Sequence, residues 1–275
     1  MATTFSPLAG ASPFRRIAAS MWSRPSDPTI YGFLDVEVTT TLEHIQALRR
    51  ETGKHITMTH VVARAVAAAF EEHPELNAKV RFWGRLEQRS TVDLTISVST
   101  QDGKDLSAAR IDDAGKMSLL EIVEEVGSNV AQTRAGEDET YERSRNTLAA
   151  LPWWMVRPLL WLTDIVSNEF QLHFPALGMP RDPFGTAIIT NVGMFGIDTA
   201  FAPFVPLGRC PMLLLVTAVQ QRPWVVGTGE DARLEVRPVL RLCASFDHRI
   251  VDGAQAGRLA TTMRRLVENP AGNLG

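Results

Sequence analysis

The sequence predicts an α+β fold in which helices cover a mixed β-sheet. Stretches typical of strands and of helices are interspersed without the regular alternation that indicates a purely parallel sheet. Residues 92–98 alternate between apolar and polar side chains, which is typical of a strand with one buried face. Residues 212–219 are apolar enough for a strand buried on both faces. A sheet that holds both kinds of strand needs helices on at least one side.

The first part of the chain is predicted to hold three helices and a strand. The expected elements are helix 14–22, strand 30–38, helix 41–52 and helix 58–70. Helix 58–70 has the clearest pattern, because its apolar residues recur every three or four positions and so share one face. Gly53 and Pro74 are suitable stops for the second and third helices.

The rest of the chain is predicted to contribute four strands and two helices. The expected elements are strand 92–98, helix 118–130, strands 186–190, 212–219 and 234–246, and helix 254–268. Ser118 followed by Glu121 is a capping box for the first of these helices. Pro238 is expected to break its strand locally. The last helix should end at Asn269, which leaves a flexible tail whose single large apolar side chain is Leu274.

We expect a flexible arm at residues 1–13 and one domain at 14–275. Within it, residues 136–183 form an unusual insert, in which 151–162 are rich in tryptophan, proline and leucine. We favour a helix packed on the domain or at a subunit contact. A lid over an acyl pocket is the second interpretation, and a helix lying on a membrane surface is the third.

Composition excludes several classes. The chain has 275 residues, 28 lysines plus arginines and 31 aspartates plus glutamates, so its net charge gives no reason to expect nucleic acid. Two cysteines are too few for a disulfide scaffold and lack metal-ligand spacing, which favours a cytoplasmic location. Neither a secretory signal nor a membrane span is predicted, and we expect no metal.

One segment near the C-terminus has the composition of a catalytic turn. His248 follows a predicted strand, where a rigid element can present a side chain to a cleft. Its imidazole, with an ordinary pKa of about 6.5, can take a proton near neutral pH. Asp252 comes four residues later, and Gly253 allows a backbone turn that other residues resist. Taken alone, this spacing more often marks a structural histidine beside an aspartate that caps a helix.

The residues around His248 form a longer motif, which favours the catalytic interpretation over the structural one. Ser245-Phe246-Asp247-His248-Arg249, followed by Asp252-Gly253-Ala254, resembles the active-site signature of the dihydrolipoamide acyltransferases, the core components of 2-oxoacid dehydrogenase complexes. It is also similar to the histidine motif of chloramphenicol acetyltransferase and of peptide-synthetase condensation domains. Three further segments resemble the first family in the same order: residues 14–18, 61–78 and 185–196. The four matches are spread along the chain from residue 14 to residue 254, across most of one domain's usual length.

The resemblance implies a two-layer sandwich of the chloramphenicol acetyltransferase type and a role for each matched residue. His248 would be the general base that deprotonates a thiol. Thr190, where the family usually has a serine, would donate a hydrogen bond to the oxyanion. Asp252 would pair with Arg15 or, as second choice, Arg16. Support for the site would come from these two arginines together with Asn191 and Gly253.

The resemblance also implies carriers and partners. Coenzyme A or a lipoyl arm would carry the acyl group as a substrate, with no tightly bound cofactor. The chain shows neither the lipoyl nor the subunit-binding domain of full-length members. We therefore expect a free-standing lipoyl protein or a dehydrogenase component as a partner. The family resemblance implies a homotrimer with its site between subunits. One leucine in the tail is too little to join trimers into a cage.

Two other functions stay open. An ester- or amide-forming transferase of the condensation type would use the same histidine. A non-catalytic scaffold of a dehydrogenase complex would keep only the fold, although the intact set of His248, Asp252 and Thr190 counts against it. The sequence does not name the acyl group or its acceptor.

Overall fold

The structure, a computed structural model, describes residues 27–100, 105–135, 152–170, 172, 182–204 and 208–274. The predicted arm 1–13, the predicted helix 14–22 and residues 136–151 of the insert lie outside the described residues. The division into an arm and one domain therefore stays a prediction.

A seven-stranded sheet forms the centre of the molecule. Its strand order is β1-β9-β7-β6-β4-β5, and β8 adds to β9. The pairs β4–β6 and β6–β7 are parallel and the others are antiparallel, so the predicted mixed sheet is confirmed. The strands are β1 (Thr29–Glu37), β4 (Leu94–Thr100), β5 (Asp105–Ile111), β6 (Ala187–Asn191), β7 (Met212–Val216), β8 (Gln220–Val226) and β9 (Arg233–Asp247). A separate two-stranded sheet joins β2 (Ala78–Val80) to β3 (Leu86–Gln88).

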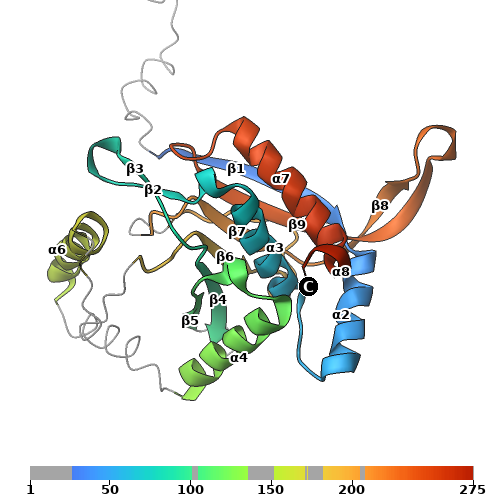
Figure 1. Cartoon of the computed structure of the whole chain (residues 1–275), viewed down its shortest axis with the longest axis horizontal. Helices are drawn as coiled ribbons and strands as arrows, with labels where there is room; N and C mark the ends of the chain where they lie inside the picture. The colour runs from blue at the N-terminus through green and yellow to red at the C-terminus, as the bar shows by residue number, and fades with distance from the viewer. Residues whose placement is uncertain are drawn as a thin grey trace, which may run out of the picture.

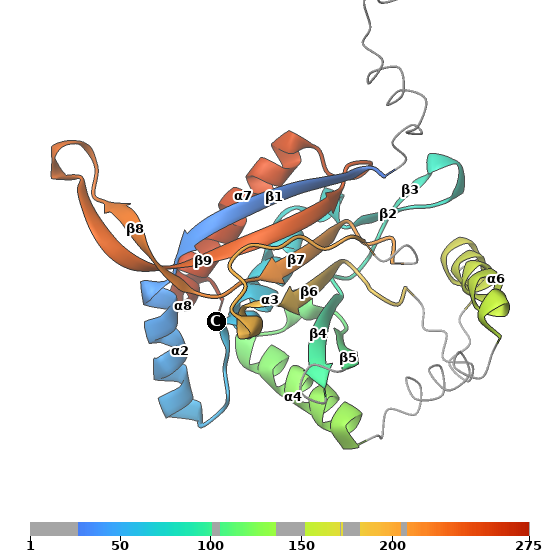
Figure 2. The ribbon, with the colours of Figure 1, turned by 180° about the vertical axis from the view of Figure 1, so that it is seen from behind.

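Helices lie over one face of this sheet. The view in Figure 1 shows α3, α4 and α7 in front of the strands, and Figure 2 shows the strands from the side without helices. The elements are α2 (Thr39–Thr52), α3 (Met58–Glu72), α4 (Leu119–Ala135) and α7 (Gly253–Glu268). Ser118 and Glu121 form the predicted capping box of α4, with N···O distances of 2.7 and 3.3 Å.

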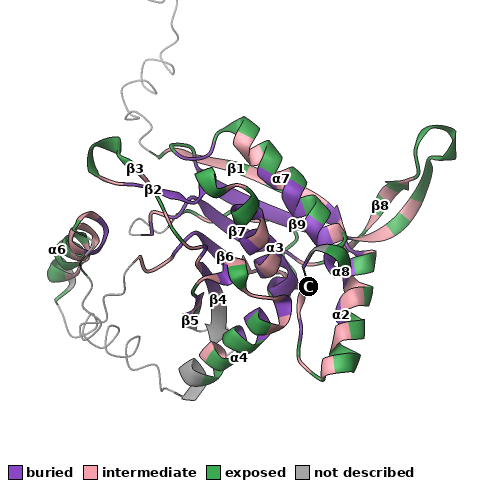
Figure 3. Cartoon of the chain, in the orientation of Figure 1, coloured by how far each residue is buried: buried purple, intermediate pink, exposed green. Residues whose placement is uncertain are grey.

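The main core lies between the helices and the sheet, where Figure 3 shows continuous burial. Helix α3 contributes most of one wall, because its buried face holds Val62, Val66 and Phe70. His60 lies on the same helix, and burial lowers its pKa to about 4. The backbone nitrogen of Thr57 donates to its Nδ1 at 3.1 Å, so this histidine has the packing and capping role of an ordinary core residue.

The predicted break at Pro238 is wrong, since β9 runs through it without interruption. Pro238 instead marks a change of partner, because β8 pairs with β9 up to Val239 and β1 pairs from Val239 onward. The first part of β9 and β8 form a hairpin that projects from the body (Figure 2). Its apolar side chains are largely exposed, as in Val236 at 71%.

Helix α6 (Trp153–Asp164) and the π-helical turn Ile165–Glu169 come from the Trp- and Pro-rich insert. The structure does not show the expected apolar packing on the domain, because Trp154 and Trp161 are 61% and 63% exposed. Ion pairs attach the segment instead: Arg209 binds Asp164 at 2.6 Å and also binds Glu169. A subunit contact stays a prediction. None of the described helices is long and apolar enough to cross a membrane.

The C-terminal tail differs from the expected flexible segment. Pro270 begins a further short helix, α8 (Pro270–Asn273), which fits the preference of proline for the first position of a helix. Leu274 follows it and is only 1% exposed, in the core beneath the helices. This leucine is therefore buried within its own chain.

The burial of Leu274 leads to a first prediction. Leu274→Ala should lower the free energy of unfolding by about 2 kcal/mol or more, because it removes a buried side chain and leaves a cavity. Urea denaturation measures this change. The matched control is Leu162→Ala at an exposed position of α6, which should change the free energy by less than about 0.5 kcal/mol. Equal small effects in both variants would show that the tail is not docked.

Candidate functional site

His248 is held at the end of the longest strand. Asp247, the last residue of β9, pairs with Thr29 of β1, and the backbone nitrogen of His248 donates to the carbonyl of Pro28 at 2.9 Å. The backbone is thus fixed on both sides of the turn while the side chain is exposed. The predicted position of His248 at a strand end is confirmed by these contacts.

The His248 ring is oriented by the turn that follows it. Its Nδ1 lies 3.0 Å from the carbonyl oxygen of Val251. A carbonyl oxygen only accepts hydrogen bonds, so Nδ1 must carry the proton when the ring is neutral. The lone pair is then on Nε2, which is the atom available to accept a proton from a substrate.

Asp247 and Arg249 stabilise this turn, and sequence reasoning gave neither a role. Asp247 is buried, and its Oδ1 accepts a hydrogen bond from the backbone nitrogen of Arg249 at 3.0 Å. The guanidinium of Arg249 binds the same carboxylate, with 2.6 Å between Nη2 and Oδ2. The hydrogen bond to the Asp247 carboxylate raises the pKa of Arg249. The sequence held one indication of this role. Asp247 and Arg249 are two residues apart, a spacing typical of an aspartate that binds the backbone of its own turn.

Asp252 caps helix α7. Its Oδ1 accepts from the backbone nitrogen of Gln255 at 2.7 Å, and Gln255 Oε1 accepts from the backbone nitrogen of Asp252 at 2.8 Å. No arginine or lysine in the described ranges forms an ion pair with Asp252. Arg15 and Arg16 lie outside the described residues, so the arginine pairing stays a prediction. The capping role was the ordinary interpretation of this spacing and is present.

The expectation that Gly253 is needed for an unusual backbone turn is wrong. Its backbone is not among those with positive φ, and a Cβ added to it would meet no atom within 4 Å. It is simply the first residue of α7. Gly193 is the glycine that the site requires, since a Cβ there would lie 2.4 Å from the carbonyl oxygen of Thr217.

Thr190 lies near the end of β6 on the face of the sheet without helices. Ile189 belongs to the core under the helices and Ile188 to a smaller cluster on the opposite face, so alternation places Thr190 on that opposite face. Asn191 points the other way and joins the turn to α3. Its Nδ2 donates to Thr59 Oγ1 at 2.8 Å, and its Oδ1 accepts from the backbone nitrogen of Met194 at 3.2 Å.

The structure does not bring His248 and Thr190 together within one chain. Thr190 is level with Leu215 of β7, which is level with Cys243 of β9. His248 lies beyond Cys243 by about 17 Å of strand, and two strand spacings of about 5 Å each separate β6 from β9. Both side chains cannot reach one carbonyl group from these positions. A site that uses both residues needs a second copy of the chain.

The remaining nucleophilic groups offer little alternative chemistry. Burial raises the pKa of Cys210 to about 12, so this thiol stays protonated. Among the residues that the structure describes, no group of three His, Cys, Asp or Glu side chains is placed to hold a metal ion.

Comparison with known sequences agrees with the local motifs. The sequence model of the 2-oxoacid dehydrogenases acyltransferase (catalytic domain) family matches residues 11–149 and 184–274. The dihydrolipoyllysine-residue acetyltransferase component of the Zymomonas mobilis pyruvate dehydrogenase complex is 26% identical over 92% of this chain and 47% of the relative. A dihydrolipoyllysine-residue succinyltransferase component from Staphylococcus saprophyticus is 24% identical over 82% of this chain and 42% of the relative. The chain thus spans about half the length of these relatives.

Solved structures share the fold. The cubic core of a pyruvate dehydrogenase multienzyme complex superposes with a TM-score of 0.65 at 20% identity, covering 90% of this chain and 84% of that chain. A truncated catalytic core of the 2-oxoacid dehydrogenase complex from Thermoplasma acidophilum gives 0.61 at 22% identity, covering 97% and 100%. The unmatched residues 150–183 coincide with the insert that contains α6.

The two roles considered for Asp252 predict different effects. Asp252→Ala should lower the free energy of unfolding by about 1 kcal/mol, the usual effect of losing a cap. Asp252→Asn keeps an acceptor oxygen and should restore most of that loss. Thermal or urea denaturation measures both.

The arginine pairing is tested separately with Asp252→Asn and Arg15→Gln in a double-mutant cycle of stability, repeated with Arg16→Gln. A coupling energy of about 0.5 kcal/mol or more supports a pair. Additive effects for both arginines would leave Asp252 as a cap alone.

Proposed function

Because the chain belongs to the family of 2-oxoacid dehydrogenase acyltransferase catalytic domains, we propose that it transfers acyl groups between thiol carriers. One observation supports the chemistry above others. His248 is fixed by its Nδ1 contact to Val251, which leaves Nε2 free to accept a proton. The contact requires no second charged residue, so the ring is prepared as a base by the backbone itself.

The reaction begins with proton transfer. His248 Nε2 takes the proton of an incoming thiol, and the resulting thiolate attacks the carbonyl carbon of an acyl thioester. A new carbon–sulfur bond forms, and the carbonyl oxygen becomes an oxyanion. The tetrahedral intermediate then expels the original carrier as a thiolate, which takes the proton from His248. The base therefore returns to its starting state in each turnover.

The oxyanion needs a hydrogen-bond donor, and Thr190 is our proposal for it. Its side chain is half-buried near the end of β6, and no protein hydrogen bond of this hydroxyl occurs among the described contacts. One such donor typically contributes about 3–4 kcal/mol to the stability of the transition state. The geometry within one chain requires that this Thr190 belong to a neighbouring copy.

A site shared in this way requires at least two copies. A two-fold dimer would pair His248 of each copy with Thr190 of the other across one interface, and a head-to-tail contact would pair them around a closed ring. The structural likeness to the cubic core of a pyruvate dehydrogenase complex favours the ring. A homotrimer is the ring that we propose.

Carriers and partners follow from the relatives. Their names specify a dihydrolipoyllysine residue as the acyl carrier and place the proteins in pyruvate or 2-oxoglutarate dehydrogenase complexes. We propose coenzyme A or a lipoyl group as carrier here, and a lipoyl protein or dehydrogenase component as partner. A cytoplasmic location is part of the proposal, supported by Cys210 and Cys243, which are buried free thiols.

The role of the base leads to a direct test. His248→Ala should lower the turnover number for acyl transfer by at least about 10²-fold, the usual scale for loss of a general base. Transfer from an acyl-coenzyme A to dihydrolipoamide measures it. His55→Ala, at an exposed histidine away from the turn, is the matched control. Unchanged turnover in the folded His248→Ala protein would falsify the assignment.

The shared site predicts complementation between two impaired chains. Thr190→Val removes the hydroxyl and should lower turnover by about 10²-fold or more. When the Thr190→Val and His248→Ala chains are co-expressed, about one quarter of the sites in randomly mixed rings combine an intact His248 with an intact Thr190. Specific activity should therefore rise far above that of either parent.

Light scattering on the same samples reports the assembly, and a mass near three chains is expected. The control is co-expression of the His248→Ala chain with a chain that carries both substitutions, which restores no intact site. Activity equal to the mean of the two parents would mean that the residues do not share a site across copies.

A further inference from the structure

The turn that carries His248 is organised by the residue before it. Asp247 is only 5% exposed. Its carbonyl oxygen accepts hydrogen bonds from the backbone nitrogens of Ile250 and Val251, both at 2.9 Å, and its Oδ1 accepts from the backbone nitrogen of Arg249 at 3.0 Å. Three successive N–H groups of the turn therefore end on one residue. Since Val251 supplies the carbonyl that lies against Nδ1 of His248, the position of Asp247 decides where that acceptor lies.

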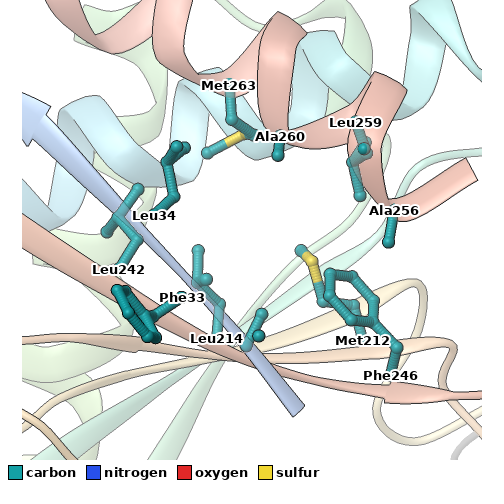
Figure 4. A pocket seen from close by; sticks show the side chains of 13 residues that line it. Phe33, Leu34, Met212, Leu214, Leu242, Phe246, Ala256, Leu259, Ala260 and Met263 are labelled. Carbon is teal, nitrogen blue, oxygen red and sulfur yellow. The ribbon is translucent and has the colours of Figure 1, made fainter. Parts of the chain in front are cut away.

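The side chain of Asp247 points away from helix α7. Phe246, one residue earlier, points into the space between β9 and α7, where Ala256 lies across from it (Figure 4). Ser245 lies on the other face of the strand, where its Oγ donates to a backbone carbonyl at 2.8 Å. Side chains alternate along a strand, so Asp247 shares the face of Ser245. Its carboxylate therefore serves the turn and not the N-terminus of α7, which has its own cap.

Arg249 compensates the charge of this buried carboxylate, which would otherwise be costly to bury. Its Nε lies 2.9 Å from Oδ1 and 3.2 Å from Oδ2 of Asp247, and its Nη2 lies 2.6 Å from Oδ2. Arginine can bind a carboxylate through two nitrogens in this way, whereas the single ammonium group of lysine cannot. The two residues that flank His248 in the sequence thus carry opposite charges that cancel.

Other titratable groups around the turn come from three neighbouring segments. Asp27, before β1, adds a smaller electrostatic attraction for Arg249. Asp252 begins α7 as its cap. Cys210 precedes β7, and burial raises the pKa of its thiol to about 12, so it is uncharged at neutral pH. Substitutions within the Asp–Arg pair leave all three groups in place, so a shift in the titration of the base reports the pair itself.

We infer that Asp247 and Arg249 are positioning residues for the general base His248. They hold the Val251 carbonyl against Nδ1, which keeps the proton on that nitrogen and the lone pair on Nε2 in the neutral ring. As a neutral pair, they add no net charge beside the ring. The inference rests on the proposed acyl transfer, and it deepens that proposal by assigning two residues that act on the reaction through His248.

Removing one charge of the pair should shift the pH dependence in a direction set by the charge that is lost. Asp247→Asn leaves Arg249 uncompensated, which disfavours the imidazolium, so the midpoint of the pH profile of kcat/KM should fall. Arg249→Gln leaves the carboxylate uncompensated, which favours the imidazolium, so the midpoint should rise. Each shift should be about 0.5 pH unit or more. The double variant is neutral again and should keep the midpoint of the wild-type protein.

The placement of the ring is measured separately, as turnover at a pH well above these midpoints. There Asp247→Asn and the double variant should lower kcat by at least about tenfold with little change in KM, because the base is misplaced while substrate binding is kept. Arg249→Lys keeps the charge but loses the two-nitrogen contact, so it should keep the midpoint and lower kcat. The matched control is Glu72→Gln with Arg265→Gln, which removes an ion pair of 2.5 Å between α3 and α7 and should change neither quantity.

A measurement without substrate separates this inference from the proposed function. Nitrogen-15 NMR of the histidine rings reports which nitrogen of His248 carries the proton, and the signal is assigned by its absence in His248→Ala. The wild-type ring should hold the proton on Nδ1. Asp247→Asn should populate both tautomers, and its titration should shift as the pH profile does. If these changes appear but no thioester is transferred, the proposed function fails and the positioning role stands.

Two results overturn the inference. One is a tautomer and a titration midpoint of His248 that are the same in Asp247→Asn, Arg249→Gln and the wild-type protein, even if kcat falls. The other is a shift of both single variants in the same direction, which would mean a general loosening of the turn. If Asp247→Asn does not fold, Arg249→Gln and Arg249→Lys decide, because the midpoint should rise in the first and stay unchanged in the second.

Discussion

Strand β9 is the central element of the sheet, because neighbouring strands are hydrogen-bonded to it along its length. Its first half pairs with β8, and its second half lies between β1 and β7. A strand paired on both sides cannot slip by one residue without moving its core side chains to the wrong face. The end of β9 is therefore one of the best-fixed points in the chain, and His248 emerges there. The proposed catalytic geometry depends on this register more than on any contact within the turn.

The turn itself adds a second constraint. Asp247 organises its backbone by accepting hydrogen bonds through its carboxylate and its carbonyl, and Arg249 neutralises the buried charge. Asp252 then begins α7 as its cap. His248 thus lies between a rigid strand and a capped helix, with its ring bound to the backbone of Val251.

Sequence patterns predicted the elements that carry their own signal. The apolar face of α3 and the capping pair of Ser118 with Glu121 are local features, and both are present. Strands β5 and β8 were missed, because neither has a clean alternation and β8 contains Pro223. Strands β2 and β3 have three residues each, too few to show a period. The burial of Leu274 depends on a distant core. For the site, the motif located His248, Asp252 and Thr190, but their separation follows from strand register, which no periodicity contains.

The projecting hairpin of β8 and β9 has a consequence for unwanted association. A ribbon of two strands outside the body leaves free backbone edges, and such edges invite pairing with the edges of other molecules. Each strand of this ribbon carries a proline, Pro223 in β8 and Pro238 in β9, and proline has no N–H to donate to a neighbouring strand. The ribbon is therefore a poor template for growth into an intermolecular sheet. It can expose apolar side chains for specific contacts while its backbone resists aggregation.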